Sequence, residues 1–282
     1  MITAPFDYEA PDSIDEAVRM LHDNGEDAKL LAGGHSLLPL MKVRLAAPTI
    51  LIDLRRVPGL HGISQYDDDW QIGAMTRHAD LQDVPEMGVA SRAASLIADQ
   101  QVRNRGTIGG SLAHADPASD LPTVVLTLDG TITAQGIGGE KRTIAAADMF
   151  QDYLTTALEH TEVITQISIP RLDDWGFGYQ KFTRRAEDWA MVGVCALVKK
   201  GAGGECEDVR VGLTHMGPTP LRASAVEDAL RGGGLDAESI ATAAAHAGDG
   251  TDPPGDLNAT PDYKRHLAAV LTRRALEEAV AP

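Results

Sequence analysis

Cysteine is nearly absent from this chain of 282 residues, which has only Cys195 and Cys206. An iron–sulfur cluster held by cysteine takes about four thiolates, and a disulfide framework needs several cysteine pairs. We therefore expect neither in this chain. Any metal-cluster chemistry that accompanies it must belong to another protein.

Long apolar runs and an excess of basic residues are also missing. The chain has no stretch of roughly 18 apolar residues, the length that a membrane-spanning helix needs. The N-terminal sequence MITAPFDYEAPDSIDEA lacks the basic and then apolar pattern of a signal peptide. The 25 Lys and Arg residues against 41 Asp and Glu give a formal net charge of -16. From the missing apolar run and signal-peptide pattern we expect a cytoplasmic protein without a transmembrane segment. Because an acidic surface repels nucleic acids and anionic membranes, we expect no nucleic-acid partner.

Hydrophobic residues make up 43% of the chain, which is enough to bury a core, and the length favours two domains. The first half begins with a helix over 13–25, where Ser13 and Glu16 form a capping box. A second helix is predicted over 92–100. Alternating or short apolar runs predict strands at 28–32, 49–54 and 162–170 and hairpins at 60–74 and 130–144.

The second half of the chain has strands followed by helices. Strand-like runs cover 176–200 and 209–217, and helical patterns cover 224–232, 236–248 and 263–279. A Gly/Pro/Asp-rich connection occupies 248–262. This order predicts an α+β second domain that begins near residue 171.

Two short segments combine a double glycine with a small hydroxyl residue: Gly33-Gly34 with Ser36, and Gly109-Gly110 with Ser111. Glycine lets backbone N–H groups approach an anion closely, and a helix N-terminus that follows adds partial positive charge. A pyrophosphate between two such turns would explain the pair, whereas the plain alternative is two ordinary turns. Neither segment matches G-x-G-x-x-G or G-x-x-x-x-G-K-[ST], so both lack the Rossmann and P-loop signatures.

These segments carry a family resemblance. AGGHSLLPLMKVRLA at 32–46 and TIGGSLAHADPASDLP at 107–122 resemble the two FAD-binding motifs of the flavoprotein (medium) subunits of the carbon monoxide dehydrogenase and xanthine dehydrogenase family of molybdenum hydroxylases. The second motif usually reads TIGGN in that family, so Ser111 is a departure. The resemblance continues through 179–190 and 262–276 and so covers essentially the whole chain.

The resemblance implies an α+β fold in two domains. Residues 1–170 would form a two-part FAD-binding domain of the PCMH (vanillyl-alcohol-oxidase-like) type, with subdomains at about 1–56 and 57–170. Residues 171–282 would form a C-terminal domain of the carbon monoxide dehydrogenase flavoprotein type, in which an antiparallel sheet packs against helices.

The resemblance also implies which residues bind FAD, and it implies neither a catalytic residue nor a metal ligand in this chain. The two glycine motifs would wrap the diphosphate, and Ile164 and Lys181 would lie near the isoalloxazine ring. A lysine there would stabilise the anionic reduced flavin, although Lys181 could equally be a solvated surface residue. The implied cofactor-binding residues are Ala32, Gly33, Gly34, His35, Ser36, Leu37, Thr107, Gly109, Gly110, Ser111, His114, Ser119, Asp120, Ile164 and Lys181.

Several of these residues and their neighbours have simpler interpretations. His114 and Asp116 lie in a segment with a proline and no second histidine, so we expect no metal site there. Asp120 precedes an apolar run and could be a helix N-cap in addition to a flavin contact. Trp189 could stack near the cofactor, but a tryptophan in a predicted strand favours a core position. The pair at 184–185 could contact a partner chain or a diphosphate, or lie at a solvated strand edge.

The resemblance implies an electron-transfer role. A large subunit with molybdopterin would oxidise the substrate, a small subunit would pass electrons through [2Fe-2S] clusters, and non-covalently bound FAD in this chain would deliver them to an external acceptor. His35 is of the type that carries covalent flavin in distant relatives, but the resemblance implies non-covalent binding. The assembly would be a dimer of three-subunit units. Two alternatives stay open: an autonomous flavoprotein oxidase with its own substrate pocket, and a non-catalytic nucleotide-binding or scaffold protein.

Overall fold

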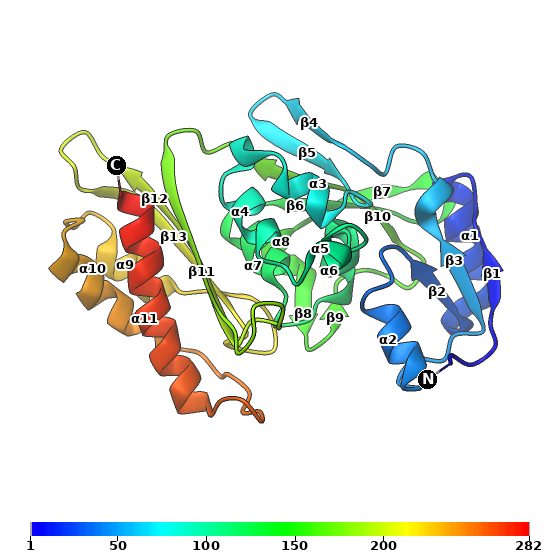
Figure 1. Cartoon of the computed structure of the whole chain (residues 1–282). Coiled ribbons are helices and arrows are strands. Elements are labelled where there is room, and N and C mark those ends of the chain that lie inside the picture. Colours follow the sequence, from blue (N-terminus) through cyan, green and yellow to red (C-terminus); the bar gives the residue numbers. More distant parts are fainter. Residues whose placement is uncertain (1, 282) are drawn as a thin grey trace.

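Three sheets follow one another along the molecule in the computed structural model, which describes residues 2–281 (Figure 1). The first is a parallel sheet of order β1-β3-β2 near the N-terminus, packed against α1. Ser13 accepts a hydrogen bond from the Glu16 N–H at 3.2 Å, as the capping box predicts, but the Glu16 carboxylate accepts from the N–H of Asp12. The elements of this part are β1 (Asp7–Glu9), α1 (Ile14–Asn24), β2 (Ala28–Leu31), α2 (Leu37–Lys42) and β3 (Ile50–Asp53).

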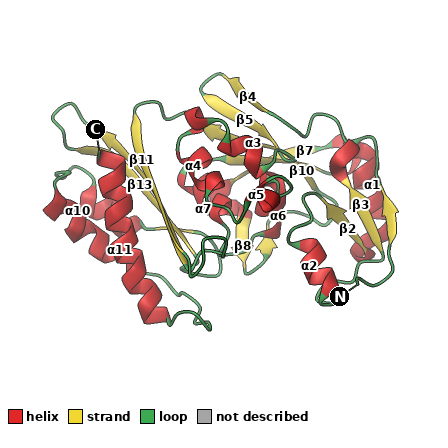
Figure 2. Cartoon of the chain, viewed as in Figure 1, coloured by secondary structure: helices red, strands yellow, loops and turns green. Residues whose placement is uncertain are grey.

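The second sheet is antiparallel, has the order β4-β5-β10-β6-β7, and is followed along the molecule by a group of short helices (Figures 1 and 2). Ile167 in the middle of β10 pairs with Ile72 on one side and Ile132 on the other. The strands are β4 (Ile63–Tyr66), β5 (Asp69–Gly73), β6 (Thr131–Gln135), β7 (Lys141–Ala145) and β10 (Val163–Pro170), with a small hairpin β8 (Phe150–Asp152) and β9 (Thr155–Thr156). The helices are α3 (His78–Gln82), α4 (Val89–Ser95), α5 (Gln100–Arg103), α6 (Ile108–His114), α7 (Asp120–Thr127) and α8 (Ala146–Met149).

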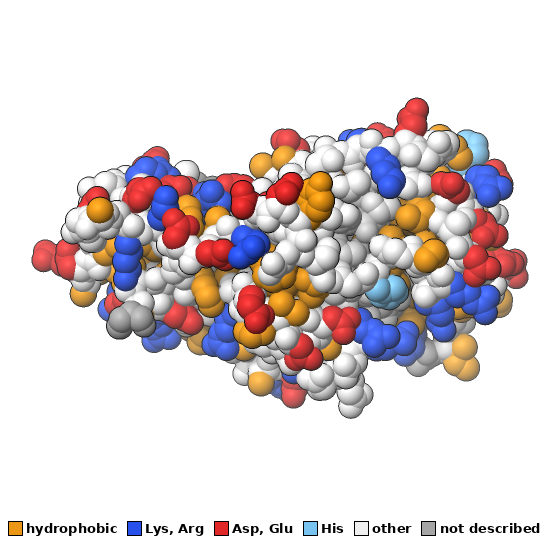
Figure 3. Space-filling view, turned by 90° about the horizontal axis from the view of Figure 1, so that it is seen from above, with side chains coloured by type: hydrophobic (Ala, Val, Ile, Leu, Met, Phe, Trp, Pro, Cys, Tyr) orange, Lys and Arg blue, Asp and Glu red, His pale blue; other side chains and the backbone are white. Residues whose placement is uncertain are grey.

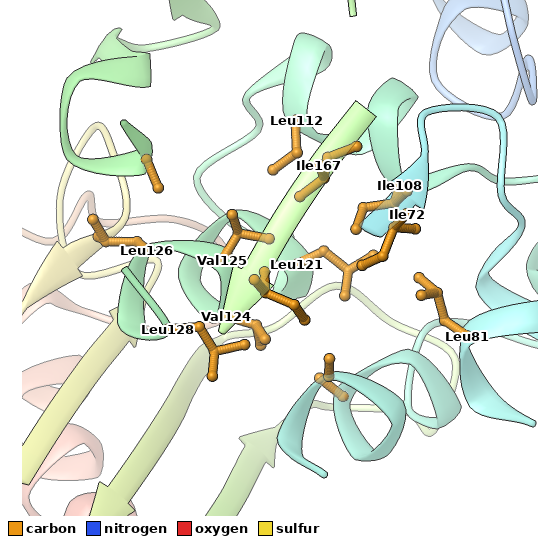
Figure 4. Close-up of a cluster of buried hydrophobic side chains, with 14 of the residues drawn as sticks. Ile72, Leu81, Ile108, Leu112, Leu121, Val124, Val125, Leu126, Leu128 and Ile167 are labelled. Atoms are coloured by element: carbon orange, nitrogen blue, oxygen red, sulfur yellow. The ribbon is translucent and has the colours of Figure 1, made fainter. Parts of the chain in front are cut away.

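Helix α7 is buried along its whole length. Its apolar residues, among them Leu121 and Val125, join Ile167 in the main hydrophobic core (Figure 4). The Thr123 hydroxyl accepts a hydrogen bond from Thr214 of the third sheet at 2.7 Å. Because α7 has packing partners in both of these sheets, its N-terminus is held at a fixed place between them.

The third sheet is antiparallel with the order β11-β12-β13-β14, and α11 lies across β11 and β12 (Figure 1). A Cβ atom at Gly176 or Gly178 would collide with the carbonyl oxygens of Ala279 and Ala275 in α11. Only glycine therefore allows this helix to lie so close to β11. The elements are β11 (Trp175–Phe182), β12 (Val192–Lys200), β13 (Cys206–Thr214), β14 (Leu221–Arg222), α9 (Ser224–Leu230), α10 (Ala237–Ala244) and α11 (Pro261–Val280).

The α+β expectation is confirmed, two local predictions need correction, and one strand was not predicted. The single strand-like run over 176–200 is a hairpin whose strands pair from Phe182 and Val192 outward, because the charged segment between them forms a loop. The helix predicted over 92–100 ends at Ser95, and the chain then turns through a positive φ of 41° at Ala98. Strand β1 escaped prediction because all three of its residues are exposed and carry no apolar pattern.

The face seen from above has no large patch of charge of one sign (Figure 3). Acidic and basic side chains are spread over that face and intermingle at both of its ends. Within residues 2–281, no helix is both long enough and apolar enough to cross a membrane.

Candidate functional site: a cavity lined by two glycine-rich segments

A cavity of about 640 Å³ lies where the three sheets approach one another, within the range of about 300–1,000 Å³ that is common for cofactor sites. Residues from Leu21 in α1 to Trp189 in the loop after β11 contribute to its wall. All of the residues predicted to bind the cofactor line it, although they are far apart in the sequence: Ala32, Gly33, Gly34, His35, Ser36, Leu37, Thr107, Gly109, Gly110, Ser111, His114, Ser119, Asp120, Ile164 and Lys181.

The first double glycine forms a turn between β2 and α2. A Cβ atom at Gly33 would collide with the carbonyl oxygen of Arg105 and come within 2.7 Å of the Gly106 Cα, so two backbone segments touch here. Gly34 has a positive φ of 79°, which favours glycine. The N–H groups of Gly34, His35 and Ser36 have no hydrogen-bond partner among the residues that the structure describes. This turn therefore offers free backbone donors of the kind that bind phosphate.

We predicted a turn at the second double glycine. In the structure, Gly109 and Gly110 instead lie in the first turn of helix α6. Thr107 caps that helix, and its hydroxyl accepts a hydrogen bond from the Gly110 N–H at 3.2 Å. The Gly109 N–H donates to the carbonyl oxygen of Ala74 at 2.8 Å, and a Cβ at Gly109 would lie 2.7 Å from the Ala74 Cβ. These N–H groups already have partners, so these glycines serve close packing rather than anion binding.

Asp120 and Lys181 form an ion pair on the cavity wall. The Lys181 Nζ lies 2.8 Å from the Asp120 Oδ2, and the two side chains are only 6% and 4% exposed. The solvated-surface interpretation of Lys181 is therefore wrong, and Asp120 compensates its positive charge. Asp120 is the first residue of α7 rather than its N-cap, which is Ser119.

The ion pair has two further partners. Lys181 also donates to the carbonyl oxygen of Leu96 at 3.1 Å, and the hydroxyl of Tyr179 donates to the Asp120 Oδ1 at 2.6 Å. Burial raises the pKa of Tyr179 well above its usual value, and the neighbouring Asp120 carboxylate adds to the shift. Tyr179 thus stays a hydrogen-bond donor at every physiological pH.

His114 and Ile164 complete the predicted set on other parts of the wall. His114 is the last residue of α6, and its Nε2 lies 3.9 Å from the Asp116 Oδ2. Burial lowers the pKa of His114 more than the Asp116 carboxylate raises it, so the ring is neutral at pH 7. Ile164 precedes a register shift in β10 and gives the wall an apolar side chain.

Among the lining residues outside the predicted set are His78 and Trp189. His78 begins α3, is 6% exposed, and has no hydrogen-bond partner for its Nδ1 within residues 2–281; a lone histidine at a helix start carries no sequence signal. The core position favoured for Trp189 is wrong, because this residue lies in the loop between β11 and β12, is 56% exposed and lines the cavity. Arg184 lies in the same loop rather than at a strand edge; its side chain is solvated, 61% exposed, and its Nε lies 3.7 Å from the Asp188 Oδ2.

His78 makes the stability of the fold depend on pH. Burial lowers the pKa of His78 from 6.5 to about 4, with smaller contributions from His35 and Arg103. The unfolded chain therefore takes up a proton that the folded chain excludes, so stability is lost as the pH falls from about 6.5 to 4. At about 1.4 kcal/mol per pKa unit, the loss amounts to about 3 kcal/mol.

The matched variant is His78→Gln, which cannot titrate. In urea unfolding followed by circular dichroism, the free energy of unfolding of the wild type should fall faster than that of the variant between pH 7 and pH 4.5. An equal pH dependence of the two proteins would contradict the assigned shift.

Two family models match the chain in succession. The FAD binding domain in molybdopterin dehydrogenase matches residues 4–172, and the CO dehydrogenase flavoprotein C-terminal domain matches residues 177–279. The carbon monoxide dehydrogenase medium chain of Hydrogenophaga pseudoflava is 41% identical over 286 residues, with 100% of this chain and 99% of the relative covered. The 6-hydroxypseudooxynicotine dehydrogenase complex subunit alpha of Paenarthrobacter nicotinovorans is 38% identical, with 98% and 94% covered.

The fold gives the same result. A chain of the solved carbon monoxide dehydrogenase from Hydrogenophaga pseudoflava superposes with a TM-score of 0.95 at 42% identity, covering 99% of this chain and 98% of that one. The glycine turn at 33–36, with its free N–H groups and backbone contact, fits a dinucleotide diphosphate. The chain therefore belongs to the family of FAD-binding medium subunits of carbon monoxide dehydrogenase and related molybdenum hydroxylases, and it is an oxidoreductase subunit whose cofactor is FAD.

Proposed function

We propose that this chain is the electron-transfer subunit of a molybdenum hydroxylase, which takes electrons from the [2Fe-2S] clusters of a partner subunit and passes them to an external acceptor. The observation that carries the proposal is the cavity of about 640 Å³, which gathers both glycine-rich segments, Asp120 and Lys181 into one wall. Bound flavin accepts electrons singly or in pairs, so it can link one-electron carriers to a two-electron acceptor.

The residues on the cavity wall would divide the cofactor between them. The turn at 33–36 offers free N–H groups to the diphosphate. Thr107, His114 and Ser119 line the wall where ribityl or ribose hydroxyls would find polar partners. Asp120, Ile164 and Lys181 would face the ring system. Nothing in this arrangement calls for a covalent bond, and we propose that FAD is held non-covalently.

The two cysteines support placing the iron–sulfur clusters in another subunit. Both are buried free thiols, and burial raises the pKa of Cys195 to about 12. Thiolate ligands must be deprotonated to bind metal, so neither residue suits a cluster. Relatives are named as a medium chain and as a subunit of a dehydrogenase complex. We propose a molybdopterin-containing large subunit and a [2Fe-2S] small subunit as partners, in a dimer of three-subunit units.

Purification of the chain with its native partners tests this function. A tagged chain from its own host should yield a complex that contains FAD, iron and molybdenum, measured by absorbance after acid release and by plasma mass spectrometry. The chain prepared alone should bind FAD without iron or molybdenum, and no organic substrate or carbon monoxide should bleach its flavin absorbance. The complete complex should show bleaching with its substrate.

Three results would contradict the proposal. Bleaching of the isolated chain by an organic substrate would indicate an autonomous oxidase. A native complex without iron and molybdenum, or FAD that sodium dithionite cannot reduce, would indicate a nucleotide-binding scaffold.

A further inference from the structure

Strand β11 sends two neighbouring side chains of one face toward the same carboxylate. Tyr179 and Lys181 are alternate residues of the strand, and they bind the two different oxygens of Asp120 at 2.6 and 2.8 Å. Tyr179 and Asp120 are 1% and 4% exposed as residues. The carboxylate therefore cannot rotate without breaking a buried hydrogen bond.

These three residues differ in their relation to the cavity. Asp120 and Lys181 line it, whereas Tyr179 is not among the lining residues and lies behind Asp120. A phenol in this place cannot touch the cofactor. Its contribution must pass through the orientation of Asp120.

The ion pair also holds another part of the wall. Lys181 donates to the carbonyl oxygen of Leu96, at the start of a turn in which Ala98 has a positive φ of 41°. Arg103 Nη1 donates to the carbonyl oxygens of Ile97 at 2.8 Å and Ala98 at 2.9 Å. A non-glycine residue persists in this conformation only when its surroundings fix it, and Lys181 and Arg103 supply the two fixing cations.

We propose that Tyr179 is a positioning residue for FAD, which fixes Asp120 and through it Lys181 and the Leu96–Ala98 turn. The inference rests on the proposed placement of FAD in this cavity. It assigns a cofactor role to a buried residue that the cofactor does not reach. The glycine segment at 109–110 and the turn at 33–36 lie outside this chain of contacts. The loss of the Tyr179 hydroxyl should therefore change the surroundings of the flavin ring as well as the affinity for FAD.

Tyr179→Phe removes the hydroxyl and leaves the Asp120 Oδ1 buried without its partner. Loss of one partner from a hydrogen bond to a charged group is costly, and we expect the dissociation constant for FAD to rise about tenfold. Flavin fluorescence quenching measures the affinity per folded chain, with the folded fraction taken from urea unfolding at the same temperature. The visible circular dichroism of bound FAD should also change, which a mere loss of stability would not produce.

The matched control is Tyr8→Phe. The Tyr8 hydroxyl donates to the Asp53 Oδ2 at 2.8 Å. This is also a tyrosine–aspartate hydrogen bond, although Tyr8 is half-exposed, and neither residue lines the cavity. This variant should keep the wild-type affinity within about twofold and the wild-type flavin spectrum. An equal loss of affinity in both variants would overturn the inference.

A double-mutant cycle tests whether Tyr179 acts through the ion pair. In a Lys181→Met background, Tyr179→Phe should weaken FAD binding by less than about twofold, because the arrangement it maintains is already lost. Additive losses would overturn the inference. If Tyr179→Phe binds FAD as tightly as the wild type does, the role of Tyr179 is overturned but the placement of FAD in the cavity is not. If the folded wild-type chain binds no FAD, both are overturned.

Discussion

Gly33→Ala should weaken FAD binding by about a hundredfold. A Cβ at this position would collide with the carbonyl oxygen of Arg105 and crowd the Gly106 Cα at 2.7 Å. Both are backbone atoms, so no side chain can swing away, and the two cavity segments must separate. Overpacking of this kind costs about 1–3 kcal/mol, and about 2.7 kcal/mol corresponds to a hundredfold change in the dissociation constant. A fluorescence-quenching titration of the purified chain with FAD measures it.

Gly136→Ala is the matched control for this substitution. Gly136 has a negative φ of -104°. A Cβ atom added there would have the Glu162 Cγ as its nearest neighbour, at an ordinary contact distance of 3.7 Å. This variant should bind FAD as the wild type does. The double variant Gly33→Val, Gly110→Val should lose binding altogether, since a side chain at Gly110 would also press on the Thr107 hydroxyl that caps α6. Wild-type affinity in a folded Gly33→Ala variant would contradict the proposed cradle.

Lys264→Met should lower the free energy of unfolding by about 3 kcal/mol. The Lys264 side chain is fully buried in α11, and its Nζ lies 2.8 Å from the Asp256 Oδ2. Removal of one partner of a buried ion pair typically costs about 3–5 kcal/mol, and we expect the lower end because Asp256 is 33% exposed. The pair holds the Gly/Pro/Asp-rich connection against α11. Urea unfolding at pH 7 measures the loss.

The same pair predicts a pH dependence in acid. Burial opposes ionisation of Asp256, but hydrogen bonds from Lys264 and from the N–H groups of Asn258 and Ala259 outweigh it and lower the pKa to about 2. The stability that the pair contributes is therefore present above about pH 4 and is lost as the pH falls toward 2. The difference between wild type and Lys264→Met should shrink over this range. A difference that stays constant down to pH 2 would refute the assignment.

Local sequence patterns predicted many of the elements of the fold. Apolar periodicity and a capping box indicated the helix at 13–25, and short apolar runs indicated the strands near 28–32 and 49–54. The charged loop at 183–191 was not predicted, because the apolar residues on both sides of it have the pattern of one long strand. Only the pairing of Phe182 with Val192 reveals the hairpin. Strand pairing is a tertiary property that periodicity within one strand does not contain.

The candidate site was predictable as a set of residues but not in its internal chemistry. The resemblance placed fifteen residues on one cavity wall, and the structure brings all of them there. It did not reveal that the N–H groups of Gly109 and Gly110 are already bonded within the protein. It also left open whether Lys181 is solvated, because the burial of that lysine depends on Asp120, 61 residues earlier in the chain. Contacts between distant segments decide both points.

The two faces of β11 join the two matched family regions into one folding unit. One face receives α11 at Gly176 and Gly178, and the other delivers Tyr179 and Lys181 to Asp120. Tyr179 is also part of the same buried core as Ile72 and Leu121 of the first region. A cut between residues 172 and 177 would therefore strip the first region of a cavity wall. Chimaeras that exchange C-terminal regions between relatives must keep this strand with the FAD-binding region whose pocket it completes.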